Sequence, residues 1–137
     1  MTRSTLPMLA LSAILGGCAT ADYGQLADSA TTAIALSNGY SEANPLLDGL
    51  SWPWIAATKI AVTQVVKLTP PEICEPGLTG LALGGFGAAI WNIGVMAGSG
   101  PAAIPIILIG GWFLFDPAVD DAKQTCADPW AFWREIN

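Results

Sequence analysis

Long uncharged stretches dominate the second half of the chain. The segment Leu78 to Ala97 (LTGLALGGFGAAIWNIGVMA) runs for twenty residues without a charged side chain. At about 1.5 Å of rise per residue, a helix of this length crosses the hydrocarbon core of a bilayer. After the turn-like sequence GSGP at 98–101, the segment Ala102 to Phe115 is again uncharged but shorter. The pattern predicts a hydrophobic helical hairpin over residues 78–115, whose second arm is either a short span or a re-entrant piece.

Glycines recur at four-residue spacing in this hairpin. One pair is Gly80 and Gly84, and the other is Gly94 and Gly98. In lipid, small residues at this spacing let two helix backbones approach closely. They predict tight helix packing or self-association through the hairpin, although glycine-rich apolar sequence also contains such spacings by chance.

Two earlier segments, 23–38 and 52–68, have helical composition but carry polar or charged residues midway. The second is two-faced, with polar residues on one face (Lys59, Thr63 and Lys67) and apolar residues opposite (Ile55, Val62 and Val66). We expect that either both segments cross the membrane or neither does. The chain is therefore predicted to be all-α, a small helical membrane protein of two to four helices.

Asp28 in the first of these segments and Lys59 in the second are candidates for an ion pair. Asp28 shares a helix face with Thr31, Thr32 and Ala35, so facing helices would set it against Lys59. An ion pair is the usual way in which membrane helices accommodate ionisable residues, and such residues are functional candidates. The alternative is an interfacial or periplasmic location for these helices, with the two charges solvated.

Aromatic residues mark expected membrane boundaries. Trp52 and Trp54 stand at the start of one predicted helix, and Trp112 stands with Phe113 and Phe115 at the expected end of the last one. Aromatic side chains of this kind are enriched at both membrane–water interfaces.

The N-terminus has the three-part layout of a secretory signal. Arg3 precedes an apolar run from Leu6 to Leu15, which is shorter than the ~20 residues of a spanning helix. Residues 1–17 are predicted to be a signal peptide, which leaves 18–137 as one domain. The tetrad Leu15-Gly16-Gly17-Cys18 resembles the lipobox of bacterial lipoproteins. The resemblance implies that Cys18 becomes the mature N-terminus on the periplasmic side and carries diacylglyceride, with palmitate among its acyl groups. The alternative is a Cys that merely ends a small apolar helix.

The cysteine count fits this arrangement. Of three cysteines, lipidation would occupy Cys18, and Cys74 and Cys126 flank the predicted hairpin. The two ends of a hairpin return to one side of the membrane, so these two thiols share a compartment. If that compartment is oxidising, they form a disulfide; otherwise they remain two free thiols. An even number of crossings must then separate Cys18 from Cys74.

Composition removes several function classes. Hydrophobic residues make up 53% of the chain and charged residues 12%, well below the roughly 25% of a soluble domain. The net charge is −6, and the five basic residues are scattered, so we do not expect nucleic acid as a partner. Histidine is absent, which removes the commonest general base and transition-metal ligand. We expect no enzyme activity, no metal and no cofactor.

The stretch from Asp28 to Leu47 (DSATTAIALSNGYSEANPLL) contains a pattern similar to the motif of a known protein family. Its pattern resembles a motif of small multispanning bacterial and phage membrane proteins of unknown function, over residues 25–97. The matching positions are Asp28, Thr31, Thr32, Gly39, Glu42, Asn44, Pro45 and Leu46, with a looser match at Trp91 and Asn92. The resemblance implies a multispanning helical fold and brings no activity with it.

Physically, the motif predicts a helix end followed by a fixed turn. Gly39 tolerates positive φ and suits a helix C-terminus, and Asn44 before Pro45 favours a turn. The polar side chains of Glu42 and Asn44 would then either satisfy backbone donors of the turn, the favoured interpretation, or bind a partner helix or a cation.

These observations predict a lipid-anchored envelope protein, in the inner rather than the outer membrane, that acts as an accessory or interaction protein, with a phage origin as one source. Its partners would be membrane lipid and another envelope protein or a second copy. The main alternative is a small oligomeric channel or holin-like protein. A third class, an intramembrane enzyme, requires Asp28 and Glu42 to converge on one cavity.

Overall fold

A computed structural model describes residues 19–42 and 44–128. This part of the chain contains four α-helices, α2 (Ala19–Ser37), α3 (Trp52–Lys67), α4 (Pro71–Met96) and α5 (Ala103–Ala127), and one 3-10 turn, η1 (Gly100–Ala102). It has no strand, so the fold is all-α as predicted. Two stretches, Pro71–Met96 and Gly100–Ala127, are long and apolar enough to cross a membrane.

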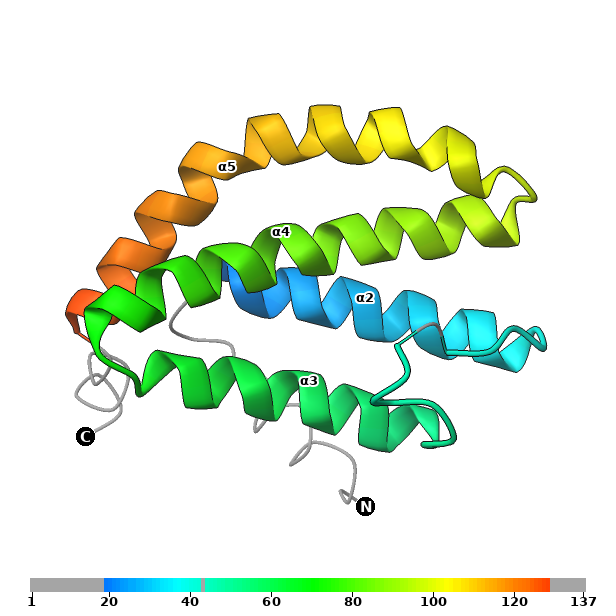
Figure 1. Cartoon of the computed structure of the whole chain (residues 1–137), viewed down its shortest axis with the longest axis horizontal. Coiled ribbons are helices and arrows are strands. Elements are labelled where there is room, and N and C mark those ends of the chain that lie inside the picture. Colours follow the sequence, from blue (N-terminus) through cyan, green and yellow to red (C-terminus); the bar gives the residue numbers. More distant parts are fainter. Residues whose placement is uncertain (1–18, 43, 129–137) are drawn as a thin grey trace, which may run out of the picture.

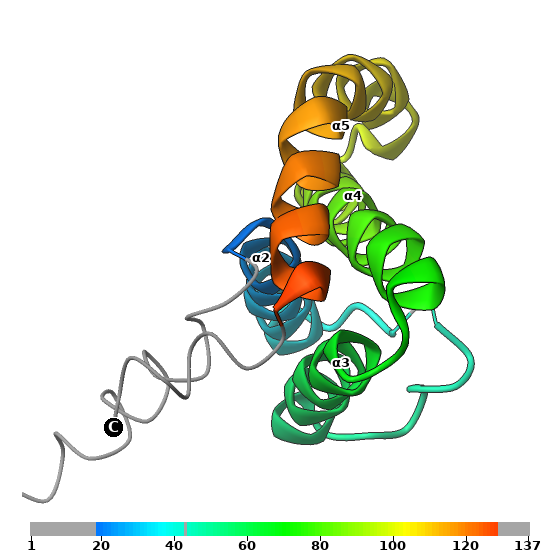
Figure 2. The same cartoon turned by 90° about the vertical axis from the view of Figure 1, so that its left-hand side faces the viewer.

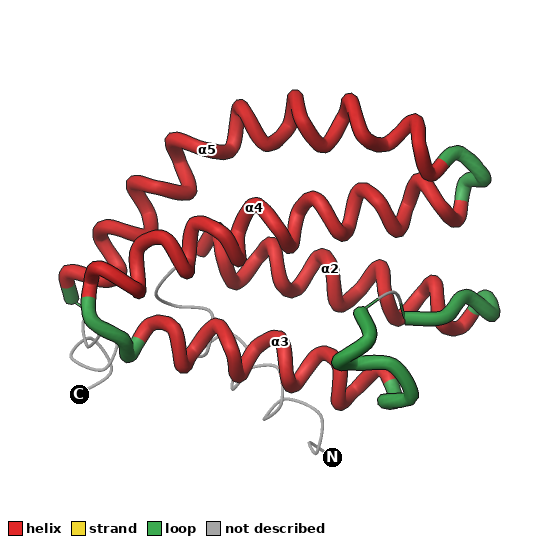
Figure 3. The backbone as a smooth tube through the Cα atoms, in the orientation of Figure 1, coloured by secondary structure: helices red, strands yellow, loops and turns green. Residues whose placement is uncertain are grey.

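Each helix runs antiparallel to the one before it, and α4 lies in the middle of the bundle (Figure 1). Seen along the bundle in Figure 2, α5 lies on one side of α4, while α2 and α3 lie on the other. Segment 38–51 and the α4–α5 turn share one end, which we call the loop end (Figure 3). The α3–α4 turn and the C-terminus of α5 share the opposite end, which we call the disulfide end.

The hairpin is longer than its uncharged core. α4 begins at Pro71, where a proline at the first helical turn needs no backbone partner. α5 continues well beyond Phe115 to Ala127, so the second arm is a continuous helix and not a re-entrant piece. Pro117 lies inside it and removes one backbone hydrogen bond. Figure 1 shows α5 bending back toward the bundle where its colour turns to orange, the part that contains Pro117.

Because α5 continues, the helix end predicted at the aromatic residues is wrong. Trp112, Phe113 and Phe115 lie near the middle of the helix. They are 83%, 74% and 51% exposed, so the bundle covers little of their rings. Trp52 and Trp54 do lie at the start of α3, and both are exposed at the loop end.

Helices α2 and α4 touch backbone to backbone at a glycine pair. A Cβ on Gly85 would lie 2.4 Å from the carbonyl carbon of Gly24, and one on Gly24 would lie 2.6 Å from the oxygen of Ala82. Real Cβ atoms do not approach so closely, so these two positions require glycine. At the predicted pair, Gly80 and Gly84, an added Cβ would meet no atom of the described residues within 4 Å, so this pair does not pack inside the bundle. Close packing through small residues therefore occurs, but at a different pair.

The two glycines of the second predicted pair, Gly94 and Gly98, have different roles at the hairpin turn. A Cβ on Gly94 would lie 2.8 Å from the Cβ of Ala103, so Gly94 lets α4 approach the start of α5. Gly98 has φ of +71°, a conformation that glycine adopts without strain, and it ends α4.

The burial pattern is in part the reverse of that in an ordinary soluble protein, although a core of mostly small hydrophobic residues is buried between α2, α4 and α5 at the disulfide end. Many polar side chains are buried (Asp22, Gln25, Asp28, Ser29, Thr32, Thr63, Lys67 and Thr125). Many large apolar ones are exposed, above all on α5 (Ile104, Ile106, Leu108, Ile109, Trp112, Phe113 and Phe115). Charged residues are rarely buried in soluble proteins unless paired, and contiguous apolar surfaces of this size are rare on them. Such a distribution matches a bundle whose outside faces lipid.

Helix α3 shows the reversal on a single element. Ile55, Thr63 and Lys67 are its buried residues, while Val62 and Val65 are exposed. Ile55 was expected opposite the polar face, but it stands four residues before Lys59 and therefore shares that face. The polar face of α3 points into the bundle.

Candidate functional site

An ion pair links α2 to α3 in the interior. The Nζ atom of Lys59 lies 2.5 Å from Oδ2 of Asp28, and the two side chains are only 12% and 11% exposed. The sequence predicted this pairing from the faces of the two helices. The chain thus buries two opposite charges against each other where a lone charge would be costly.

Asn92 of α4 ties the same carboxylate to a third helix. Its side-chain nitrogen lies 3.3 Å from Oδ1 of Asp28, and 3.1 and 3.2 Å from the hydroxyl oxygens of Thr31 and Thr32. The Thr32 hydroxyl also donates to Oδ1 of Asp28 at 3.3 Å. We call these four residues, together with Lys59, the Asp28 cluster. Their contacts fix α2, α3 and α4 in register, because each partner comes from a defined turn of its helix.

A second buried ion pair lies nearer the disulfide end. Lys67 of α3 donates to Oδ2 of Asp22 at 2.8 Å, and Gln64 lies 3.4 Å from the other oxygen. Close to it, Gln25 donates from its side chain to the backbone oxygen of Leu81 on α4 at 2.7 Å. The interior between α2, α3 and α4 is therefore connected by hydrogen bonds over much of its length.

The sequence analysis missed this second pair, although a signal was present. Asp22 stands six residues before Asp28, and Lys67 stands eight residues after Lys59. Because α2 and α3 are antiparallel, both steps run toward the same end of the bundle, by roughly 9 Å along α2 and roughly 12 Å along α3. The second ion pair could therefore have been predicted together with the first.

Cys74 and Cys126 form a disulfide at the disulfide end, with 5.8 Å between their Cα atoms. The bond joins the start of α4 to the last turn of α5 and closes the base of the hairpin. At the same end, the backbone nitrogen and hydroxyl of Thr20 both donate to Oδ2 of Asp121, at 2.8 and 2.6 Å. The start of α2 thus lies beside the disulfide. Cys18, the predicted lipid site, and the signal peptide lie outside the described residues.

The motif corner at the loop end has the predicted turn. Gly39 has φ of +85° directly after α2. Oε1 of Glu42 accepts a hydrogen bond from the backbone nitrogen of Asn44 at 2.9 Å, and Oδ1 of Asn44 accepts one from that of Leu46 at 3.0 Å. Asn44 and one oxygen of Glu42 therefore satisfy backbone donors, which was the favoured interpretation.

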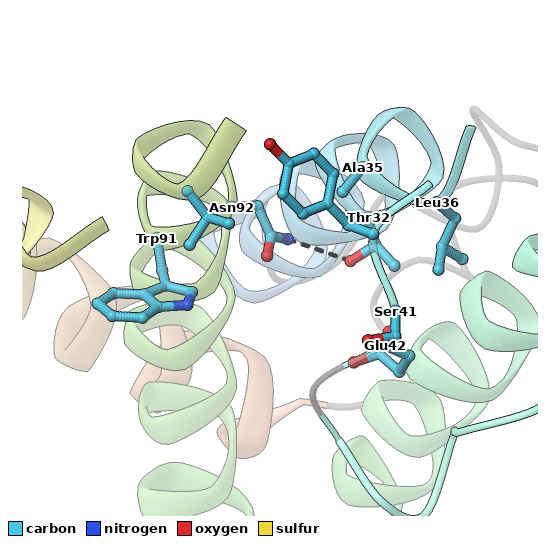
Figure 4. A pocket seen from close by; sticks show the side chains of 9 residues that line it. Thr32, Ala35, Leu36, Ser41, Glu42, Trp91 and Asn92 are labelled. Atoms are coloured by element: carbon cyan, nitrogen blue, oxygen red, sulfur yellow. Dashed lines mark hydrogen bonds between the residues drawn. The ribbon is translucent and has the colours of Figure 1, made fainter. Parts of the chain in front are cut away.

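A small cavity of about 90 Å³ opens beside this corner, between α2, α4 and the following segment. Its lining is mixed (Thr32, Ala35, Leu36, Tyr40, Ser41, Glu42, Trp91, Asn92 and Val95). Figure 4 shows Thr32 and Asn92 joined by their hydrogen bond at the inner side, with Ser41 and Glu42 on another side. We call this space the loop-end cavity.

Asp28 and Glu42 do not converge. Glu42 lines the loop-end cavity, whereas Asp28 and Lys59 are not among its lining residues and are engaged with each other. The two carboxylates therefore do not both line this cavity.

Comparison with known proteins adds no relative: no protein-family model matches the chain, and neither does a curated protein or a solved structure.

Proposed function

We propose that this chain is a lipid-anchored helical envelope protein that acts by binding within the membrane, as an accessory or interaction protein, and not by catalysis. The reversed burial pattern carries this proposal. Beside a small hydrophobic core, its interior contains hydrogen-bonded polar side chains that hold three helices together, and its outer surface offers apolar side chains along α5. In lipid, the exposed arm is a surface for acyl chains or for a helix of another protein.

The proposed topology has all four helices passing through the membrane. The outer faces of α2 and α3 carry exposed apolar side chains such as Ile34, Val62 and Val65, while their charges are paired inside. Helices of 19 and 16 residues reach about 28 and 24 Å, close to a bilayer core. With four crossings, Cys18 and the disulfide stand on the same side. An oxidising periplasm on that side agrees with both the lipid attachment and the disulfide.

One observation favours the second candidate, a small oligomeric channel or holin-like protein. A Cβ added at Gly80 or Gly84 would meet no atom of the described residues within 4 Å, so this face of α4 is open to a helix of another copy. The two candidates differ in what they do alone in a membrane. A channel releases solute from sealed vesicles, whereas an accessory protein leaves them intact.

The test uses the full chain expressed in a bacterial host and extracted in mild detergent. Intact-mass analysis is expected to show residues 18–137 plus acyl groups, with a gain of two hydrogens on reduction. Cys18→Ser is the control and should leave the chain uncut. Reconstitution into dye-filled vesicles then separates the candidates: retained dye and copurification with another envelope protein support the accessory role. Dye release by oligomers would favour the channel, and an uncut, lipid-free wild-type chain would contradict the anchor.

A further inference from the structure

A larger cavity lies between α4 and the middle of α5, on the outside of the bundle. Its volume is about 620 Å³, within the range of roughly 300–1,000 Å³ that small-molecule sites have. Its lining is apolar except for one acidic residue (Leu83, Ile107, Leu108, Gly111, Trp112, Phe115 and Asp116). We call this space the hairpin cavity. An apolar cavity with one charged residue in its lining suits an amphipathic ligand.

The apolar wall of the hairpin cavity is long enough for most of one acyl chain. Ile107 and Phe115 are eight residues apart on α5, so this wall extends for about 12 Å. One leaflet of a bilayer core is about 15 Å thick, because the whole core is about 30 Å. The lining side chains of Leu108, Trp112 and Phe115 are exposed, so an acyl chain enters from outside the bundle without displacing packed side chains.

The acidic end of the cavity suits a positively charged headgroup. Asp116 is exposed and is the first charged residue after the uncharged stretch 100–115. It belongs to neither of the two ion pairs described above and has no ion-pair partner among the described residues. Glu75, which also has no such partner, lines an adjoining cavity that shares Leu83 and Phe115 with this one. A cation stabilises an unpaired carboxylate beside apolar surface.

Trp112 adds a second contact for a cation. It stands four residues before Asp116, so the two side chains project from the same face of α5. An ammonium ion beside the carboxylate is then within reach of the exposed indole, the best aromatic partner for a cation. Anionic lipids are disfavoured, since the second half of α5 carries three acidic residues and one basic one (Asp116, Asp120, Asp121 and Lys123).

We propose that the hairpin cavity binds an aminophospholipid. Its ammonium group pairs with the carboxylate of Asp116 beside Trp112, and one acyl chain lies along α5 toward Ile107. This inference rests on the proposed membrane function and deepens it, because it names the lipid that the exposed arm selects. A second copy is disfavoured as the occupant, since two copies in the same membrane orientation would bring their Asp116 carboxylates together.

The experiment uses the detergent-purified full chain with equimolar phosphatidylethanolamine and phosphatidylglycerol of identical acyl chains. Native mass spectrometry counts the molecules of each lipid that the chain retains. Asp116→Asn removes the charge at the cavity. Asp120→Asn is its matched control, because Asp120 is an exposed acidic residue of the same helix that does not line the cavity.

A second pair of variants tests the apolar part. Gly111→Leu fills the cavity, and Gly84→Leu is its control. At both glycines an added Cβ would meet no atom of the described residues within 4 Å, but of the two only Gly111 lines the cavity.

The wild-type chain is expected to retain phosphatidylethanolamine about fivefold over phosphatidylglycerol, as one partly exposed ion pair would give. Asp116→Asn should abolish this preference, whereas Asp120→Asn should keep it. Gly111→Leu should lower the retention of both lipids, and Gly84→Leu should behave as the wild type.

The proposal is overturned if the wild-type chain retains both lipids equally, as non-selective lipid would be, or if Asp116→Asn keeps the preference. It is also overturned if Gly111→Leu retains lipid as well as the wild type does. A second polypeptide that is bound to the wild-type chain and lost in Gly111→Leu would overturn it too, because a protein helix would then occupy the cavity. Vesicle integrity and the mass of the mature chain do not depend on Asp116, so failure here would leave the proposed function standing.

Discussion

The two sides of α4 are built on different principles. Toward α2 and α3 it meets a polar interior with ion pairs, shared amides and a glycine contact that admits no side chain. Toward α5 it meets an apolar arm. In the most hydrophobic 18-residue stretch of that arm, only 11% is buried, against 28% in the corresponding stretch of α4. One side is held by polar contacts and a glycine contact. On the other side, the first half of α5 exposes its large apolar side chains, and the second half packs into the core at the disulfide end.

This difference follows from the solvent that we infer. In water, the apolar side chains of α5 would drive it onto the bundle, whereas in lipid they gain little by leaving the acyl chains. An arm in lipid must therefore be held at its ends. The structure has such ties: the tight α4–α5 turn at the loop end, and the Cys74–Cys126 disulfide at the other.

The largest expected effect is on the polar side. Lys59→Met leaves Asp28 as a buried unpaired carboxylate, so the free energy of unfolding in detergent should fall by about 3 kcal/mol. Thermal unfolding followed by circular dichroism measures it. The double variant Asp28→Asn/Lys59→Met removes both charges and should recover most of the loss. A double variant as unstable as the single one would show that the ion pair is not what the interior depends on.

The disulfide comes next, because it acts on the α5 side. Replacing both Cys74 and Cys126 with Ser should lower the free energy of unfolding by about 2 kcal/mol. It should also let the C-terminal half of α5 leave α4, while the Asp28 cluster stays protected. Hydrogen exchange resolved along the chain measures both regions at once. Equal loss of protection in α2 and α5 would mean that the two sides are one cooperative unit.

A slightly smaller effect is expected at the glycine contact. Gly85→Ala puts a methyl group against the backbone of Gly24, which overpacks the α2–α4 contact and should cost about 1–2 kcal/mol. Gly84→Ala is its neighbour-matched control: the added Cβ would meet no atom of the described residues within 4 Å, and alanine favours a helix, so it should be neutral or slightly stabilising. The same unfolding assay compares the two, and equal effects would contradict the packing described here.

The smallest effect is expected on the arm itself. Leu108 is 69% exposed, so Leu108→Ala should change the free energy of unfolding by less than about 0.5 kcal/mol. Leu78 is fully buried in the core beside the disulfide, and Leu78→Ala should cost about 2–3 kcal/mol. A loss at Leu108 that matched the loss at Leu78 would place the arm inside a packed core.

The sequence predicted the parts of this structure that depend on helical periodicity or on the return of a helical hairpin to its starting side. The Asp28–Lys59 pair followed from residues repeating at four-residue intervals, and the partnership of Cys74 with Cys126 followed from the geometry of a hairpin. The positive φ of Gly39 followed from its place after a helix.

The remainder depended on three-dimensional contacts that periodicity does not specify. Gly85 rather than Gly84 faces α2, because the helix rotation is set by the Gly24 contact. Asn92 completes the Asp28 cluster from a helix more than sixty residues away in sequence. The loop-end cavity exists only because α4 passes beside the turn after Gly39. It could therefore not be predicted from the position of Glu42 in the sequence.

The most direct test of the account asks what touches the exposed apolar side chains. A photo-crosslinking benzoylphenylalanine is placed at position 108 on α5, at position 65 on α3, or at position 46 in the loop, where Leu46 is 86% exposed. After irradiation in native membranes, mass spectrometry identifies the adducts. The account predicts lipid or membrane-protein adducts at 108 and 65 and none with acyl chains at 46. Equal absence of lipid adducts at all three positions would contradict a bundle with its polar residues inside and its apolar surface in the membrane.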